Sequence, residues 1–282
     1  MLPGTERPTR VVKSTDGTPI AVFTSGEAER ERRLPSNHLV VVHGTTADHT
    51  TFRVVGPKFA RGRSTHAIDR RGRGASGDAA SYTIEREFED VAAVVDAVTA
   101  ETGQPVDVLG HSFGGRCALG AALLTGNVRR VVSYEGAPAP PGLSYQNPDL
   151  VGRVRELLAD DRREALLETF LRQIVGMTDA DIDAYRVNPV WPARVAAAPT
   201  IVRELEAESS RAASLDALGG VSAPVLQILG GASLPVFGEA TRALDARLAN
   251  AKVVVIEGAK HAAHHTHTIG FVAAVEAFLD AD

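Results

Sequence analysis

The 282-residue sequence predicts an α/β fold, in which a mostly parallel central sheet is flanked by helices. Two patterns lead to this prediction. The apolar runs are continuous and do not alternate with polar residues, which is typical of strands buried on both faces of a parallel sheet. Between these runs lie segments with helical periodicity, so strand and helix alternate through most of the chain.

The elements are expected in a simple order. A β-hairpin opens the chain, with strands over Arg10–Ser14 and Ile20–Thr24 and a turn at Asp16-Gly17. Buried strands are predicted at Leu39–Val42, Val106–Leu109, Val131–Ser133, Val225–Leu229 and Val253–Ile256. Helices between and after them are predicted at Glu87–Thr99, Gly115–Thr125, Phe237–Ala249 and Thr268–Leu279.

One interval breaks this alternation, because no strand pattern appears from Ala137 to about Ala223. Helical patterns in this interval cover Leu150–Leu158, Arg163–Ile174, Ala180–Tyr185 and Thr200–Glu208. Two pairs resemble helix-start capping pairs, Asp161 with Glu164 and Thr178 with Asp181. We therefore predict a helical cap over residues 137–223, inserted into a core of residues 1–136 and 224–282. Such a cap would lie over the strand ends, where ligands bind in open α/β sheets.

Composition and charge narrow the function classes. The formal charge of −5 arises from 30 basic and 35 acidic residues, a balance too mild to indicate a nucleic-acid partner. Cys117 is the single cysteine, and we interpret it as a small buried residue. Met1–Arg10 has no signal-peptide core, and no apolar run approaches the roughly 20 residues of a membrane span. We expect a cytoplasmic protein with a small-molecule partner; a homo-oligomer is compatible with the sequence but not indicated by it.

The most specific motif is Gly110-His111-Ser112-Phe113-Gly114, between a predicted strand and a predicted helix. A serine on such a sharp turn is held above the sheet, and the glycines allow the strained backbone. The start of the helix adds backbone N–H groups that favour negative charge. The motif therefore predicts that Ser112 is a nucleophile.

Three further segments accompany this motif in order: His43–Thr46, Asp69–Gly77 and Glu257–His261. With them the chain resembles the α/β-hydrolase family over nearly its whole length. The resemblance implies that the first segment is the oxyanion loop, that the second is a D-x-R-G-x-G-x-S turn, and that the third carries the catalytic histidine. In this turn Asp69 and its arginines are expected to order the backbone, with Arg70 or Arg71 near the pocket mouth.

His261 is the predicted general base, because imidazole titrates near neutrality and can return the proton to the leaving group. His264, His265 and His267 compete for this role, but we expect them to begin the last helix as partly solvated residues. Three other histidines, His43, His49 and His111, are expected to shape loops or pack beside the nucleophile.

The oxyanion would be met by the backbone N–H of Phe113 and by one from Thr45 or Thr46. Losing one such donor typically costs on the order of 3 kcal/mol of transition-state stabilisation.

The position of the catalytic acid departs from the commonest family pattern, because the loop Gly230–Pro235, where an aspartate is usual, holds no carboxylate. Glu135 ends the preceding strand, where some family members, including certain haloalkane dehalogenases, place the acid. We predict that Glu135 is the catalytic acid. Asp149 and Asp216 are distant alternatives. A further alternative is a weakened dyad of serine and histidine that has no acid.

The sequence thus predicts a serine hydrolase that cleaves a small carboxylic ester, thioester or lactone with an apolar acyl part, without metal or cofactor. Two alternatives stay open at this point. The same residues could serve C–C hydrolysis, a lyase, a cyclase or acyl transfer, since chemistry depends on the pocket and not on the fold. The chain could also be a receptor-like binding protein with little turnover. Cap residues that we expect to form its own core, with a subset lining the pocket, are Tyr145, Leu158, Phe170, Met177, Tyr185 and Trp191.

Overall fold

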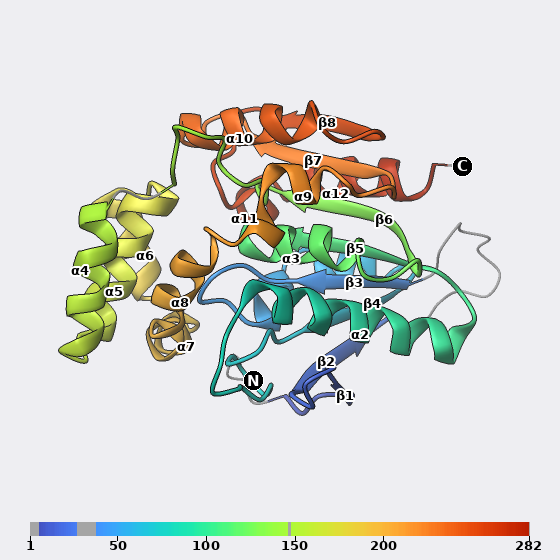
Figure 1. Cartoon of the computed structure of the whole chain (residues 1–282), viewed down its shortest axis with the longest axis horizontal. Coiled ribbons are helices and arrows are strands. Elements are labelled where there is room, and N and C mark those ends of the chain that lie inside the picture. Colours follow the sequence, from blue (N-terminus) through green and yellow to red (C-terminus); the bar gives the residue numbers. More distant parts are fainter. Residues whose placement is uncertain (1–5, 27–37, 146–147, 282) are drawn as a thin grey trace.

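The computed structural model of the chain describes residues 6–26, 38–145 and 148–281. Within them, eight strands form one sheet in the order β1-β2-β4-β3-β5-β6-β7-β8 (Figure 1). The strands are β1 (Arg10–Lys13), β2 (Pro19–Ser25), β3 (His38–Val42), β4 (Ser64–Ile68), β5 (Val106–His111), β6 (Val128–Tyr134), β7 (Val225–Gly230) and β8 (Ala251–Ile256). The β1–β2 and β2–β4 pairs are antiparallel, and all other pairs are parallel. The predicted fold class is confirmed.

Helices cover both faces of the sheet. One face packs against α2 (Ile84–Thr102), α3 (Phe113–Ala121), α9 (Leu215–Leu218) and α10 (Pro235–Asp245). The other face packs against α1 (Gly56–Phe59), α11 (Ala263–Thr266) and α12 (Thr268–Leu279). The inner strands β3 and β5 are buried on both sides, which explains their continuous apolar runs. The prediction of a buried strand at Val253–Ile256 is wrong in its burial, because β8 is an edge strand of the sheet and Val253 and Val255 are exposed.

The interval between β6 and β7 carries a separate group of helices at one end of the sheet, which we term the helical layer (Figure 1). It consists of α4 (Pro148–Ala159), α5 (Arg163–Phe170), the π-helical turn η2 (Leu171–Val175), α6 (Asp179–Arg186), α7 (Trp191–Ala197) and α8 (Thr200–Ala207). These helices bury a hydrophobic cluster of their own that includes Phe170 and Trp191, with Leu158, Met177 and Tyr185 packed against it. Tyr145, in contrast, packs against the cluster of the sheet.

The strand β4 is not predicted by the sequence pattern, because Ser64-Thr65-His66-Ala67 has no apolar run. Its polar side chains are nevertheless buried, and that of His66 bonds to two other strands. His66 Nε2 lies 3.2 Å from His38 Nδ1, and His66 Nδ1 lies 3.0 Å from Thr24 Oγ1. Such satisfied polar groups can occupy a core strand without a hydrophobic signature.

One predicted capping pair is confirmed and the other is wrong. Thr178 and Asp181 form a reciprocal capping box at the start of α6. At the start of α5 the N-cap residue is Arg162, which makes no side-chain capping bond, and Asp161 bonds instead to Arg163. Asp161 has a φ of 52°, so it ends the preceding turn in the left-handed region and does not cap the helix.

The turn from Asp69 to Gly77 is ordered by the Asp69 carboxylate, as predicted. Its Oδ1 accepts from the His49 backbone N–H at 2.8 Å, and its Oδ2 accepts from that of Ala75 at 2.8 Å. The placement of Arg70 or Arg71 at a pocket mouth is wrong, because both side chains are fully buried.

Buried carboxylates hold these two arginines. Arg70 pairs with Glu87 and with Glu204 of α8, at 2.7 and 2.9 Å. Arg71 pairs with Asp90 at 2.7 Å. The turn therefore connects the core to the helical layer through a buried ion pair, and breaking such a pair is costly.

The prediction for Met1–Arg10 lies partly outside the described residues, because residues 1–5 are not among them. Among the described helices, none is both long and apolar enough to cross a lipid bilayer.

Candidate active site

Ser112 stands at the junction of β5 and α3, with φ 55° and ψ −125°. Its backbone N–H donates to the Tyr134 carbonyl at 2.7 Å, and its carbonyl accepts from the Gly115 N–H at 2.8 Å. A non-glycine residue at positive φ is uncommon and strained. The surrounding bonds hold Ser112 in this conformation, at the N-terminal end of α3.

The glycines of the motif are required by close packing. A Cβ at Gly110 would overlap the Gly114 carbonyl, and a Cβ at Gly114 would overlap the carbonyls of Val42 and His43. The turn can therefore approach β3 only with hydrogen atoms at these positions. This packing brings the loop after β3 against the turn that carries Ser112.

That loop is His43–Thr46, and a Cβ built on Gly44 would lie 3.1 Å from the Ser112 Cβ. His43 is buried; its Nε2 accepts from the Arg70 N–H at 3.0 Å, so its Nδ1 carries the proton and donates to the Gly44 carbonyl at 2.8 Å. Thr46 is buried with φ 59°, while Thr45 is half-buried. The loop therefore lies beside Ser112 in a conformation that His43 supports.

Glu135 follows β6 directly and is buried, with φ 49°. Its Oε2 contacts the Nδ1 of His261. Its Oε1 accepts from the Gly230 N–H at 2.7 Å and from the Ser233 hydroxyl at 2.6 Å. The loop after β7, which lacks a carboxylate, thus supplies two donors to the carboxylate of the neighbouring strand.

His261 lies in the loop after β8 and is buried. Its carbonyl accepts from the His111 Nε2 at 2.8 Å, and its ring stacks on Phe237 at 4.7 Å between centroids. The Tyr134 hydroxyl donates to the Lys260 carbonyl and accepts from the Ala263 N–H. Because Glu135 occupies Nδ1, Nε2 is the ring nitrogen available for proton transfer.

Backbone strain is concentrated at this site. Among the described residues, the non-glycine residues at positive φ are Thr46, Ser112, Glu135 and Asp161. The first three lie in the loop after β3, at the turn between β5 and α3, and directly after β6. Strained residues persist where the surroundings hold them and often gather at functional sites.

The expectation for the later histidines is wrong for His264, which is buried in α11. Its ring lies 4.5 Å from that of His111 and 6.1 Å from that of Phe52. His265 and His267 are half-buried. The alternative acids lie elsewhere: Asp216 is exposed and pairs with Arg247 at 2.9 Å, and Asp149 is exposed in α4.

Sequence reasoning missed two supporting residues, Ser233 and Tyr134. Ser233 had a signal, since it is the hydroxyl residue in a loop without a carboxylate. Tyr134 gave none, because its two partners lie more than a hundred residues away. In the described ranges, no group of three or more His, Cys, Asp or Glu side chains has the arrangement of a metal site.

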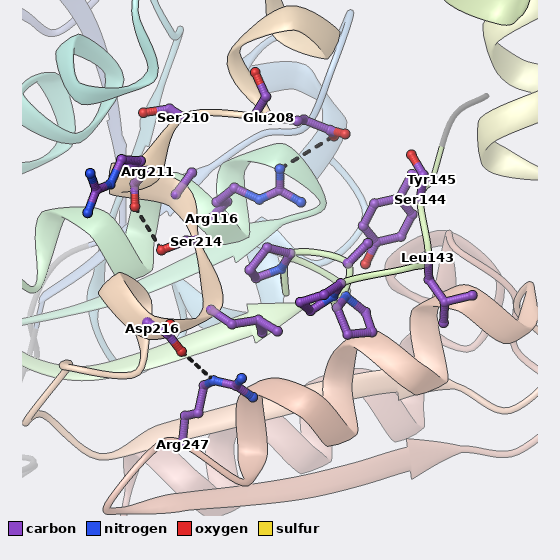
Figure 2. A pocket seen from close by; sticks show the side chains of 17 residues that line it. Arg116, Leu143, Ser144, Tyr145, Glu208, Ser210, Arg211, Ser214, Asp216 and Arg247 are labelled. Carbon is purple, nitrogen blue, oxygen red and sulfur yellow. Dashed lines mark hydrogen bonds and ion pairs between the residues drawn. The ribbon is translucent and has the colours of Figure 1, made fainter. Parts of the chain in front are cut away.

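A pocket of about 420 Å³ opens between the segments 138–145 and 208–216, the two connections to the helical layer (Figure 2). The Arg116 side chain, from α3, lines the pocket and pairs with the Glu208 carboxylate at 3.4 Å. Tyr145 donates to the Ala137 carbonyl at 2.7 Å and packs on Phe237 at 5.0 Å between centroids. Since Phe237 stacks on His261, two aromatic rings separate this pocket from the imidazole.

The buried histidines predict a loss of stability in acid. Burial lowers the pKa of His43 and His264 well below the usual range and that of His66 to about 3, whereas burial raises the pKa of Asp107 to about 6. Unfolded histidine takes up its proton near pH 6.5, so the unfolded state binds more protons as the pH falls below that value. Each histidine that stays neutral in the folded state lowers the unfolding free energy by about 1.4 kcal/mol per pH unit below pH 6.5, and the raised pKa of Asp107 offsets one such group.

Urea unfolding at pH 7, 6 and 5 measures this slope. A His66→Gln variant should show a slope shallower by about 1.4 kcal/mol per pH unit, because one titrating group is removed. A free energy of unfolding that stays constant from pH 7 to pH 5 would contradict the assignment of these histidines as neutral.

Comparisons with known proteins agree with this architecture. A model of the alpha/beta hydrolase family matches residues 39–275. A pimeloyl-(acyl-carrier protein) methyl ester esterase of Neisseria meningitidis serogroup B is 28% identical over 271 residues, covering 89% of this chain and 97% of that protein. The structure of an alpha/beta hydrolase from Sphaerobacter thermophilus has a TM-score of 0.75 at 28% identity, covering 93% of this chain and 99% of the other. That of an enol-lactonase from Burkholderia xenovorans has a TM-score of 0.76 at 19% identity, covering 96% and 99%.

Proposed function

Because the chain belongs to the alpha/beta hydrolase family, we propose that it is a serine hydrolase for a small carboxylic ester, thioester or lactone with an apolar acyl part. The observation that carries this proposal is the contact of buried Glu135 with His261, in a fold that presents Ser112 on a strained turn. The similarity to a methyl ester esterase favours ester cleavage over the other reactions of the fold. The interval of residues 137–223, which contains the helical layer, would act as the cap over a core of residues 1–136 and 224–282.

In the proposed reaction, the Ser112 hydroxyl attacks the carbonyl carbon while His261 Nε2 takes its proton. The tetrahedral intermediate collapses when His261 protonates the leaving alcohol or thiol, which leaves an acyl-enzyme on Ser112. Water, deprotonated by the same imidazole, then releases the acid and restores the serine. Glu135 holds the Nδ1 proton and stabilises the imidazolium in both halves of the reaction.

The oxyanion would be bound by the backbone N–H of Phe113, the residue after the nucleophile, and by one from Thr45 or Thr46. Two observations support this assignment. Phe113 begins α3, whose N-terminal N–H groups favour negative charge. Gly44 of the loop His43–Thr46 packs against Ser112, and Thr46 in the same loop has a left-handed backbone conformation.

The test is hydrolysis of p-nitrophenyl esters of increasing acyl length, with Ser112→Ala measured beside the wild type. We expect turnover by the wild type, with one preferred acyl length, and no turnover above background in the variant. Equal rates for the two proteins on every ester would reject a serine hydrolase and favour a binding function for the fold.

A further inference from the structure

Arg194 is a half-buried cation in α7 of the helical layer, and no carboxylate lies within ion-pairing distance of it in the described part of the chain. Its Nη2 donates to the Thr51 hydroxyl at 3.2 Å. Thr51 is buried in the short helix η1 (His49–Phe52), which follows the oxyanion loop. A half-buried guanidinium loses hydration, and a single hydroxyl replaces only part of it.

The position of Arg194 relates it to the active site. Phe52, next to Thr51, lies 6.1 Å from the His264 ring, which lies 4.5 Å from the ring of His111, the neighbour of Ser112. Burial is the main cause that lowers the pKa of His43, His111 and His264, and the Arg194 cation adds to the lowering in each. Arg194 is therefore close enough to act on residues of the oxyanion loop, the nucleophile turn and the histidine loop.

The neighbouring charge has the same sign. Arg53 follows η1 directly, is exposed, and bonds through Nη1 to the Thr50 carbonyl at 3.4 Å. Arg53 and Arg194 both add to the burial that lowers the pKa of His265 to about 4. The two arginines make this side of the site electropositive, which favours an anionic group and increases its local concentration.

We propose that Arg194 binds a carboxylate at the far end of the substrate's acyl chain, so that the enzyme prefers monoesters or lactones bearing a second, free carboxylate. The inference rests on the proposed hydrolase function and narrows its substrate class. Guanidinium and carboxylate form charge-assisted, often bidentate hydrogen bonds. Nη2 of Arg194 donates to the Thr51 hydroxyl, and Nη1 and Nε are further hydrogen-bond donors of the same guanidinium. The apolar part of the acyl chain would then lie between this carboxylate and Ser112.

The kinetic test compares two esters of equal length, the mono-p-nitrophenyl ester of adipic acid and p-nitrophenyl hexanoate, with the Ser112→Ala rate subtracted. We expect a higher kcat/KM on the adipate ester in the wild type. Arg194→Gln should lower kcat/KM about ten- to a hundredfold on that ester and leave the hexanoate rate unchanged, since a hydrogen bond to a charged group has about this strength. Arg194→Lys should retain part of the preference.

Two matched variants separate recognition from structure. Thr51→Val removes the hydroxyl that Arg194 bonds and keeps the cation, so it should keep the preference for the adipate ester. Arg153→Gln removes an exposed arginine of α4 that pairs with Glu156, and it should change neither rate. An equal loss on both esters in Arg194→Gln, or a loss of preference in Thr51→Val as large as in Arg194→Gln, would overturn the proposal.

Calorimetric titration with adipate measures the affinity of Arg194 for a carboxylate without any turnover. We expect binding by the wild type and by Arg153→Gln, and an affinity at least tenfold weaker in Arg194→Gln. Equal binding by the wild type and Arg194→Gln, or no binding by either, would overturn the assignment of Arg194. If neither ester is turned over but adipate binds through Arg194, the hydrolase function fails while the carboxylate site stands.

Discussion

A Glu135→Gln variant is expected to lose about four orders of magnitude in kcat, the loss that follows when a triad carboxylate becomes an amide. The hydrogen bonds of Glu135 explain why. Its two oxygens accept from His261 on one side and from Gly230 and Ser233 on the other. An amide offers one oxygen, so in either orientation its NH2 group meets a donor. The variant therefore either forces the wrong imidazole tautomer or leaves the Gly230 N–H unpaired.

The measurement is kcat on the preferred p-nitrophenyl ester, with a thermal unfolding curve for each protein. Glu257→Gln is the matched control, because Glu257 is an exposed carboxylate of the same loop as His261. It should leave kcat within a few fold of the wild type. Turnover by Glu135→Gln that matches this control would exclude Glu135 as the acid and favour a dyad of Ser112 and His261.

A Ser112→Ala variant is expected to lose about six orders of magnitude in kcat, as other serine hydrolases do when the nucleophile is removed. The remaining rate would come from binding and from the oxyanion donors, which this change leaves in place. Alanine has a Cβ like serine, so the strained conformation at φ 55° costs both residues about the same. We therefore expect the variant to fold with nearly the wild-type stability.

Ser233→Ala provides a graded comparison, since it removes one hydroxyl donor from Glu135 and leaves the nucleophile intact. A loss of about tenfold in kcat is expected from one hydrogen bond to a charged group. If Ser112→Ala retained as much activity as Ser233→Ala, another residue would have to be the nucleophile.

Local patterns explain which parts of the fold could be predicted from the sequence. Leu39–Val42 is a continuous apolar run and Val225–Leu229 is interrupted only by Gln227, and the structure has β3 and β7 there. The strand β4 could not be predicted, because the buried polar residues His66 and Thr65 resemble surface residues in the sequence. The helix α7 escaped as well, since it is only seven residues long and has a proline at its start.

The candidate site likewise has residues that could be predicted from the sequence and residues that could not. Ser112, His261 and Glu135 could be named because each stands at the end of a predicted strand or in the loop after it. The partners of the supporting residues could not be named, because they depend on contacts between distant segments. Ser233 reaches Glu135 across 98 residues, and Arg194 reaches Thr51 across 143. Arg70 or Arg71 was expected near the pocket mouth for the same reason, since the buried carboxylates that pair with them lie in another segment of the chain, in α2.

The central claim is that Ser112 is an activated nucleophile, and labelling with a fluorophosphonate tests it without knowledge of the substrate. Such a reagent forms a stable phosphonyl ester with an activated serine, and peptide mass mapping locates it. We predict a single adduct per chain on Ser112, formed far more slowly in Glu135→Gln. No adduct in the folded wild-type protein, or an adduct on a residue other than Ser112, would contradict the claim.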